Sequence, residues 1–150
     1  MSSDLPDTSA RGATENLAIL LREPYRISSE RLVERFAERG HPEIRAAHGN
    51  VFPFLDSAGT RVSVLAERAQ ITKQSMAELV VHLERRGYVE RIPDPSDRRA
   101  KLVRATSKGD ELYAIAREFV AELEAEWTDR LGAPRMRQLR ELLVELNAGL

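Results

Sequence analysis

The spacing of apolar residues predicts that the first part of the chain is helical. From Thr14 to about Arg39 they recur roughly every three or four residues, which places them on one face of a helix. Pro24 lies within this run and lacks a backbone donor, so we expect a kink or a new helix start there. Gly40-His41-Pro42 ends the helix, and Pro42 suits the first turn of a short second one. A helix follows that carries Val51, Phe52, Phe54 and Leu55.

The middle of the chain predicts two helices joined by a tight turn. The first follows a single-bridge strand at Arg61-Val62 and carries Val64, Leu65 and Ala69. Gln70-Ile71 forms the turn, and Thr72 is a suitable N-cap for a helix from Lys73 to about Arg86. Gly87 ends this helix in a left-handed conformation. Its buried stripe has the spacing i, i+3, i+4 and i+7 and consists of Met76, Leu79, Val80 and Leu83.

The second half of the chain predicts a hairpin and two further helices. Runs of β-forming residues from Tyr88 to Ile92 and from Lys101 to Ala105 are joined by a polar turn over residues 93–100. A long helix from about Lys108 to Leu131 follows, capped by Thr106 or Ser107, and Gly132 and Pro134 separate it from the last helix. The apolar stripes are Leu112, Ile115, Ala116, Phe119, Val120 and Leu123 in the long helix, and Met136, Leu139, Leu142, Leu143 and Leu146 in the last.

This order of elements predicts a mainly α fold with a winged helix-turn-helix lobe. A short helix, a tight turn, a capped helix and a hairpin follow one another in the order of that motif. We expect a mobile tail over residues 1–12 and a single domain over residues 13–150. The stripes of the last two helices exceed what one small lobe can cover, which predicts a homodimer.

Composition narrows the class of protein. The 150 residues are 42% hydrophobic and 31% charged, which is typical of a soluble and mostly helical protein. The absence of cysteine excludes disulfides, thiolate metal sites and thiol-based redox sensing. The chain shows no long apolar run and no secretory leader pattern, so we expect no membrane span and a cytoplasmic location. It also lacks a Ser/His/Asp pattern, a Gly-rich phosphate loop and a carboxylate pair in an apolar context, so we expect neither an enzyme nor a cofactor.

Charge is distributed unevenly along the chain. The formal net charge is −1, but residues 61–108 contain 11 Lys and Arg against 6 Asp and Glu, a balance of +5. A basic middle within an acidic frame indicates that one face meets phosphate. The alternative is the ordinary fluctuation of charge along a chain.

The solvent face of the second middle helix carries side chains suited to DNA. If the apolar stripe is buried, Lys73, Gln74, Ser75 and Glu78 face solvent near the helix N-terminus. A carboxamide such as that of Gln74 can bridge N6 and N7 of adenine, or it can contact phosphate. Glu78 either accepts a hydrogen bond from N4 of cytosine or stands near phosphate as a bystander. A plain solvated face is the alternative for this helix taken alone.

The hairpin tip is expected to be basic. Over residues 97–101 it places Arg98, Arg99 and Lys101 beside one carboxylate, and a guanidinium there can reach the minor groove or clamp a phosphate. Asp97 would then bond the tip backbone or an arginine. A purely structural basic turn is the alternative, but helix, cap and hairpin in this order are far more specific to DNA binding.

With these motifs the sequence resembles the MarR family of winged helix-turn-helix regulators, named for multiple antibiotic resistance. The resemblance covers roughly residues 14–148 in element order. It is strongest in the wing, residues 94–109, where Asp97, Arg98 and Arg99 match the family's Asp-x-Arg. It also includes residues 62–68, 72–80 and 83–91.

The resemblance implies a homodimeric repressor that binds a pseudo-palindromic operator until a small ligand loosens it. It implies dimerisation helices within residues 13–58 and 107–150 and a winged helix-turn-helix over residues 59–106. The family's DNA contacts fall on Lys73, Gln74, Ser75, Glu78 and Arg99. Glu78 departs from the family pattern, where many members have a basic or hydroxyl residue, and Pro24 and Pro53 interrupt helices that are usually continuous.

Effectors of this family bind where the dimerisation helices meet the DNA-binding lobe. Here that region is expected to include Tyr25, Arg45, His48, Phe52 and Phe54. Aromatic walls with one or two polar groups suit a planar, anionic compound, although the same side chains would also serve to fill a core. The three histidines, with Glu43, lack the spacing of a ligand set, so we expect no metal.

Two functions from different classes remain. One is a ligand-tuned repressor that binds double-stranded DNA, and the other is a winged-helix dimer that acts through a protein partner and binds DNA weakly. The cations Arg98, Arg99 and Lys101 favour the first, because a protein-binding module has no need of all three on its wing.

Overall fold

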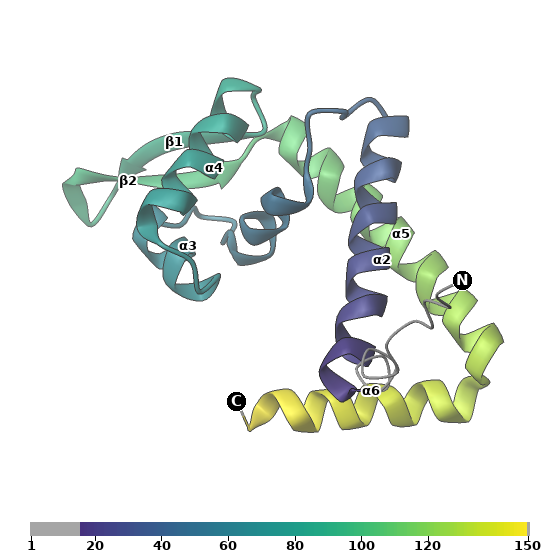
Figure 1. Cartoon of the computed structure of the whole chain (residues 1–150). Coiled ribbons are helices and arrows are strands. Elements are labelled where there is room, and N and C mark those ends of the chain that lie inside the picture. The colour runs from purple at the N-terminus through teal and green to yellow at the C-terminus, as the bar shows by residue number, and fades with distance from the viewer. Residues whose placement is uncertain (1–15, 150) are drawn as a thin grey trace, which may run out of the picture. The chain divides into compact units, whose positions relative to one another are not determined.

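The computed structural model describes residues 16–149, and the chain divides into two compact units, residues 1–46 and 47–150 (Figure 1). The described part is mainly helical, and the second unit adds one antiparallel two-stranded sheet. The mainly α fold class predicted from the sequence is therefore confirmed. The tail expected over residues 1–12 lies outside the described residues. Within residues 16–149 no helix has the length and apolar character needed to cross a membrane.

The first unit is built on one helix, α2 (Leu17–Glu38). It begins at Asn16, whose side-chain oxygen accepts a hydrogen bond from the amide of Ala18 at 2.9 Å. Pro24 lies inside it, and the helix continues past that residue, so no new helix starts there. The guanidinium of Arg26 pairs with Glu23 and Glu30 on the same face, which supports the turn around the proline.

The segment after α2 corrects the prediction of a short helix from Pro42 and a helix bearing Val51 to Leu55. It forms two short 3₁₀ helices instead, η1 (Ala46–Asn50) and η2 (Phe52–Phe54). Pro53 cannot donate a backbone hydrogen bond, and glycine at position 49 disfavours an extended helix, so the chain closes tighter i→i+3 turns. The amide of Val51 donates to the His48 carbonyl at 3.0 Å in this way.

The helix-turn-helix consists of α3 (Val62–Arg68) and α4 (Lys73–Arg85). The predicted cap is confirmed, because the Thr72 hydroxyl accepts a hydrogen bond from the Ser75 amide at 3.1 Å. Gln70, in the turn, takes a positive φ of 54°. The predicted bridge strand lies one residue earlier than expected, at Thr60, which pairs with Val103, because Arg61 and Val62 already begin α3.

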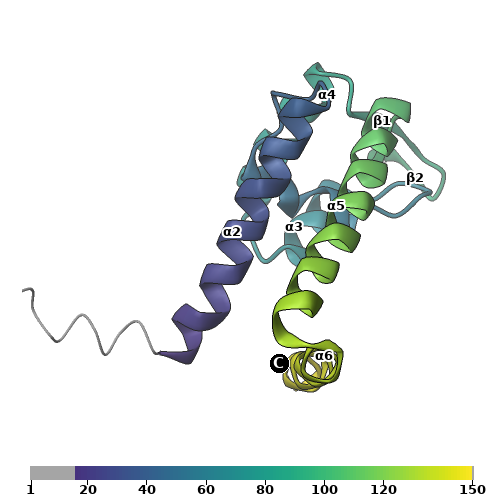
Figure 2. The ribbon, with the colours of Figure 1, turned by 90° about the vertical axis from the view of Figure 1, so that its right-hand side faces the viewer.

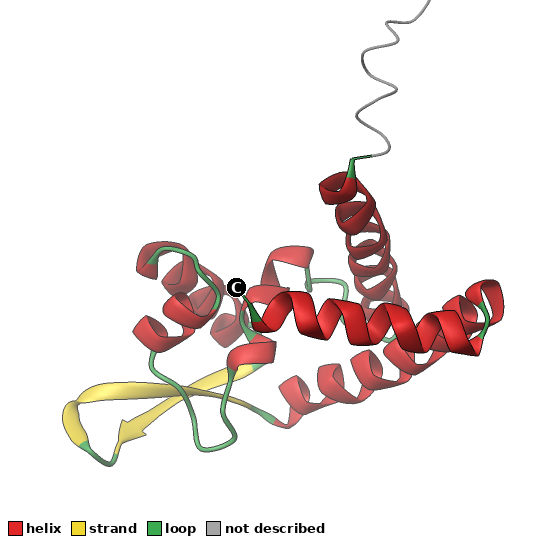
Figure 3. Cartoon of the chain, turned by 90° about the horizontal axis from the view of Figure 1, so that it is seen from below, coloured by secondary structure: helices red, strands yellow, loops and turns green. Residues whose placement is uncertain are grey.

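The wing is a hairpin of β1 (Val89–Asp94) and β2 (Asp97–Ala105), drawn in yellow in Figure 3. The long polar turn predicted over residues 93–100 is wrong, because the turn contains only residues 95 and 96. Pro93 pairs with Lys101 and Asp94 pairs with Asp97, so residues 98–100 form an irregular bulge in β2. Polar residues can extend an exposed hairpin when the partner strand supplies backbone hydrogen bonds, and single-sequence patterns do not reveal that pairing.

Two helices complete the second unit, α5 (Ser107–Leu131) and α6 (Ala133–Ala148), with Gly132 between them at a φ of 85° (Figure 2). Thr106 is the N-cap of α5, and its hydroxyl accepts from the Gly109 amide at 3.2 Å.

Buried side chains of α4 join those of the wing and α3 in one core: Leu65, Met76, Val80, Leu83, Tyr88 and Val103. Leu79, expected in the buried stripe, is only half-buried. The helix α6 buries no residue of its own.

Candidate nucleic-acid interface

The N-terminal half of α4 presents a polar face to solvent. Lys73, Gln74, Ser75 and Glu78 are all exposed, while Met76 and Val80 on the same helix are buried in the core. The 3.6-residue period of the helix separates these two sets, as the apolar stripe predicted. A helix that enters the major groove by its N-terminal end requires this arrangement, because its first turns must be both accessible and polar.

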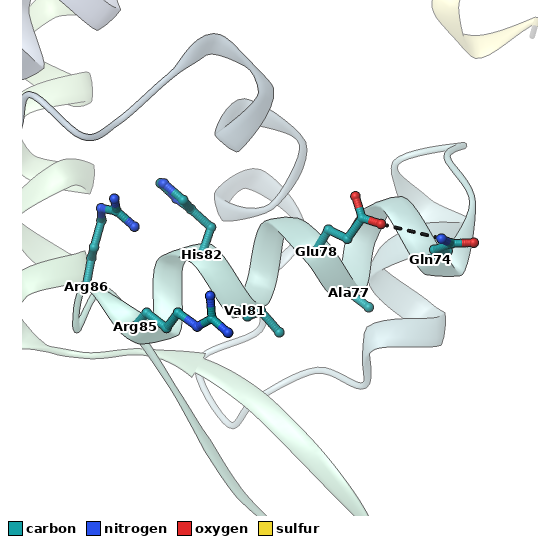
Figure 4. Close-up of a pocket in the computed structure, with 7 residues that line it drawn as sticks. All are labelled: Gln74, Ala77, Glu78, Val81, His82, Arg85 and Arg86. Atoms are coloured by element: carbon teal, nitrogen blue, oxygen red, sulfur yellow. Dashed lines mark hydrogen bonds between the residues drawn. The ribbon is translucent and has the colours of Figure 1, made fainter.

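The polar side chains of α4 are partly ordered by one another. The amide nitrogen of Gln74 donates to Glu78 at 3.5 Å, one helical turn away (Figure 4). One amide hydrogen of Gln74 thus points toward Glu78, while the other amide hydrogen and the amide oxygen remain available. A bidentate contact with adenine requires both of these groups, because the N–H donates to N7 and the oxygen accepts from N6. Ser75 belongs to the helix cap, because its hydroxyl oxygen accepts from the Thr72 hydroxyl at 2.8 Å.

The wing carries three exposed cations, Arg98, Arg99 and Lys101, along β2. The expectation that the two arginines sit on a turn is wrong: they lie in the bulged part of the strand, directly after Asp97. Asp97 serves the protein, as predicted, because its carboxylate accepts a hydrogen bond from the amide of Arg99 at 3.0 Å. This contact holds the bulge that displays the two arginines.

Two residues that the sequence analysis did not single out, Arg61 and Asp94, connect the wing to the start of α3. Arg61 donates from Nε to Asp94 Oδ2 at 2.7 Å, and its Nη2 lies 2.6 Å from the same oxygen. Asp94 also accepts from the amide of Ser96 at 2.8 Å and from its hydroxyl at 2.7 Å. The hydrogen bonds from Ser96 and the charge of Arg61 lower the pKa of Asp94 to about 2, so the side chain is a carboxylate at neutral pH.

The root of the wing is held to the neighbouring helices. The hydroxyl of Thr106 donates to the carbonyl of Gly87 at 2.5 Å, just after α4 ends. The ammonium of Lys108 donates to the carbonyl of Arg86 at 3.0 Å and lies 4.2 Å from the centre of the Tyr88 ring. Lys108 therefore contributes its charge to the end of α4 and the start of the wing.

Comparison with known proteins gives the same architecture. MepR of Staphylococcus aureus, solved in a DNA complex, superposes with a TM-score of 0.70 and 18% identity, over 90% of this chain and 98% of MepR. CouR of Rhodococcus jostii RHA1, solved with p-coumaroyl-CoA, gives a TM-score of 0.68 and 24% identity, over 89% of this chain and 92% of CouR. At these identities the likeness is one of fold, and it confirms the winged helix-turn-helix.

The sequence comparisons relate part of the chain to one family. The MarR family model matches residues 47–100. The transcriptional regulator HosA of Escherichia coli O111:H- is 31% identical over 88 residues, which are 59% of this chain and 65% of HosA. Over this part of its length the chain is similar to the MarR family. The match spans just under two thirds of HosA, and the helix-turn-helix and the wing cations of this chain lie within residues 47–100 or directly beside them.

The exposed face of α4 extends beyond the residues predicted from sequence. A depression of about 420 Å³ runs along the helix (Figure 4). The described residues that line it are Gln74, Ala77, Glu78, Val81, His82, Arg85 and Arg86. Arg85 and Arg86, both exposed, add two cations at the C-terminal end of α4. Their spacing from the buried stripe was the signal in the sequence that would have identified them.

The residues expected to line an effector pocket are divided between the two units. Tyr25 and Arg45 are exposed residues of the first unit, whereas His48 and Phe52 belong to the second. The rings of His48 and His82 stack with their centres 4.6 Å apart, which packs η1 against α4. Among residues 16–149 there is no group of three or more potential metal ligands.

Phe52 and the half-buried Phe54 lie in η2, and Phe52 is tied to α5 by Tyr113. Its ring meets the Tyr113 ring edge-on with 5.6 Å between the centres, and its carbonyl accepts from the Tyr113 hydroxyl at 2.7 Å. Burial raises the pKa of Tyr113, and the nearby charge of Asp110 adds to that shift. Packing within the second unit therefore engages Phe52, and the assignment of an effector pocket stays a prediction.

Proposed function

We propose that this protein is a transcription regulator that binds double-stranded DNA as a homodimer and represses a pseudo-palindromic operator until a small molecule releases it. One observation supports the proposal most directly: the same lobe exposes both the polar face of α4 and the three wing cations. A helix reads base edges in the major groove, and a basic wing beside it contacts phosphate or the minor groove. The relatives support the proposal through the DNA complex of MepR and the ligand complex of CouR.

Electrostatics favours DNA over a protein partner. Residues 61–108 carry a balance of +5 although the whole chain has a formal net charge of −1, so the positive charge is concentrated in the lobe that displays α4 and the wing. Contacts from Lys and Arg to phosphate release counterions, and this release supplies much of the affinity of such a lobe.

A gel shift with the DNA upstream of the protein's own gene tests the proposal. We expect a discrete complex that survives excess nonspecific competitor and weakens steeply as salt is raised. A reporter placed behind the same DNA should be repressed by the protein in cells. Binding that competitor DNA removes completely, with no effect on the reporter, would contradict the proposal and favour a protein partner.

The wing cations predict the effect of Arg99→Ala. Operator affinity should fall about tenfold for each wing, because a hydrogen bond to a charged group is worth about 1.5 kcal/mol. The slope of log affinity against log salt should decrease by about one unit for each phosphate that the variant no longer neutralises. Arg104→Ala is the matched control, since Arg104 lies on the same strand but pairs with Glu90 at 2.7 Å. Equal affinity and equal salt slope for Arg99→Ala and the wild type would show that the wing does not contact DNA.

The polar face of α4 predicts the effect of Gln74→Ala on specificity. In a dimer, two copies of Gln74 should enter successive major grooves about 34 Å apart. Loss of a bidentate contact to adenine should reduce discrimination at one symmetric pair of operator positions by roughly 1–3 kcal/mol. The measurement is the affinity of the variant for the operator and for versions changed at each half-site position, with Gln138→Ala on α6 as control. A uniform loss would make Gln74 a phosphate contact, and an unchanged profile would remove it from the interface.

A further inference from the structure

The wing is attached to the residues that precede α3 at two separate points. At its root, Thr60 and Val103 exchange two backbone hydrogen bonds, of 2.8 and 2.9 Å. Next to the turn of the wing, the guanidinium of Arg61 forms an ion pair with the carboxylate of Asp94 at 2.6–2.7 Å. Val103 is paired with Arg91, and Asp94 lies three residues further along β1, so the two attachments are about 10 Å apart.

Two attachments on consecutive residues restrict a hairpin more than one does. The backbone pairing at Thr60 alone would leave the hairpin free to bend about its root, since a two-stranded ribbon is a weak structure by itself. The ion pair at Arg61 removes that freedom, because it fixes the end of β1 next to the turn. The side chain of Asp94 is only 6% exposed and both its oxygens accept hydrogen bonds, so the carboxylate is shielded from water, whereas the Arg61 side chain is 40% exposed.

Arg61 connects the wing to the start of the helix-turn-helix. Arg61 is the N-cap residue of α3, and α3 leads through the tight turn into α4. Its Nη2 also lies 3.8 Å from Asp97 Oδ2, and Asp97 holds the amide of Arg99. A connected path of contacts therefore leads from the start of the helix-turn-helix to the bulge that displays the wing cations.

We propose that Arg61 and Asp94 are positioning residues for DNA binding, which hold the wing cations at a fixed place relative to α4. This inference rests on the proposed function. Neither residue needs to touch DNA, since the guanidinium of Arg61 is directed to two aspartates of the wing. A wing that is already in place loses less entropy on binding than one that must be ordered by the DNA.

The test is a double-mutant cycle between Asp94→Asn and a variant without the wing cations, Arg98→Ala, Arg99→Ala and Lys101→Ala. Asparagine has the shape of aspartate but lacks the charge that holds Arg61. Asp94→Asn should weaken operator binding about tenfold in the wild type. In the variant without wing cations it should change affinity less than about twofold, because no DNA contact of the wing remains to be positioned. Low salt keeps the weaker complexes measurable.

Asp56→Asn is the matched control. Asp56 also pairs with an arginine of α3, Arg68, at 3.0 Å, but it lies outside the wing, and an asparagine oxygen can still accept the hydrogen bond that the Thr60 hydroxyl donates to it at 3.2 Å. Its replacement removes the same single negative charge, so it corrects for the change in overall electrostatics. It should leave operator affinity within about twofold of the wild type in both backgrounds.

Hydrogen exchange of the free protein supplies a readout that does not need DNA. In Asp94→Asn the amides of residues 97–103 should exchange faster, while those of α4 keep the wild-type rate. Equal exchange in the wing, or losses of affinity that simply add in the cycle, would overturn the positioning role while leaving the proposed function intact. A wild-type protein that binds no operator DNA would overturn the proposed function, and the positioning role with it.

Discussion

Replacement of Gly109 by alanine is expected to lower the free energy of unfolding by about 2 kcal/mol or more, even though alanine is the better helix former. Gly109 lies in the first turn of α5, where an added Cβ would be well inside van der Waals contact with the carbonyl oxygen of Tyr88. It would also lie 3.2 Å from the Cβ of Ala105. The carbonyl of Tyr88 accepts from the amide of Thr106 at 3.1 Å, so its displacement also disturbs the cap that starts α5.

Urea unfolding at one fixed protein concentration measures this effect, since concentration alters the apparent stability of an oligomer. Gly49→Ala is the matched control. No heavy atom lies within 4 Å of the Cβ position at Gly49, so its stability should stay within about 0.5 kcal/mol of the wild type. If Gly109→Ala were as stable as the control, the close packing of α5 on Tyr88, the residue before β1, would be wrong.

The double variant Leu142→Glu with Leu146→Glu is expected to be monomeric and to bind operator DNA about 10²–10⁴-fold more weakly. These leucines of α6 are 56% and 51% exposed in a single chain. Among residues 16–149, every large hydrophobic side chain with high exposure belongs to α2, α5 or α6, and none to the winged helix-turn-helix lobe. An apolar surface of this kind marks a protein interface, and a second copy of the chain would cover it. A monomer engages one half-site and loses the gain from binding two at once.

Light scattering at micromolar concentration measures the oligomeric state, and circular dichroism verifies that the helices persist. Arg137→Glu is the matched control, because it changes the charge by the same two units but lies about 140° round the helix from Leu142, at an exposed polar position. It should remain dimeric and bind DNA as the wild type does. A wild-type protein that is monomeric with intact helicity would contradict the predicted dimer and the model of two half-sites.

Local rules predicted the helices and their ends well. Thr72, Gly87, Thr106 and Gly132 mark boundaries in the structure as they did in the sequence, because a cap or a left-handed residue acts within one helical turn. The segment over residues 42–55 was predicted less well. Its apolar residues suggested a helix, whereas Pro53 and packing against distant residues such as Tyr113 produced two 3₁₀ turns.

The candidate site was predicted on α4 more completely than on the wing. The helical period alone placed Lys73, Gln74, Ser75 and Glu78 opposite the buried stripe, so their exposure followed from the sequence. The wing depends on which residues of two strands face each other. Its polar residues suggested a long turn, but the observed pairing of Asp94 with Asp97 leaves a turn of two residues and a bulge that carries both arginines.

Patterns within short stretches of the chain were enough to establish the mainly helical fold, the helix-turn-helix followed by a hairpin, the polar face of α4 and the resemblance to the MarR family. Periodicity, caps and motifs depend on residues that are close together in the chain. The register of the wing and its attachment through Arg61 and Asp94 emerged only from the three-dimensional fold. Those residues are 33 positions apart, and no local preference brings them together. The ion pair forms because the fold of the whole lobe places the end of β1 beside the start of α3, where a shielded carboxylate needs a donor.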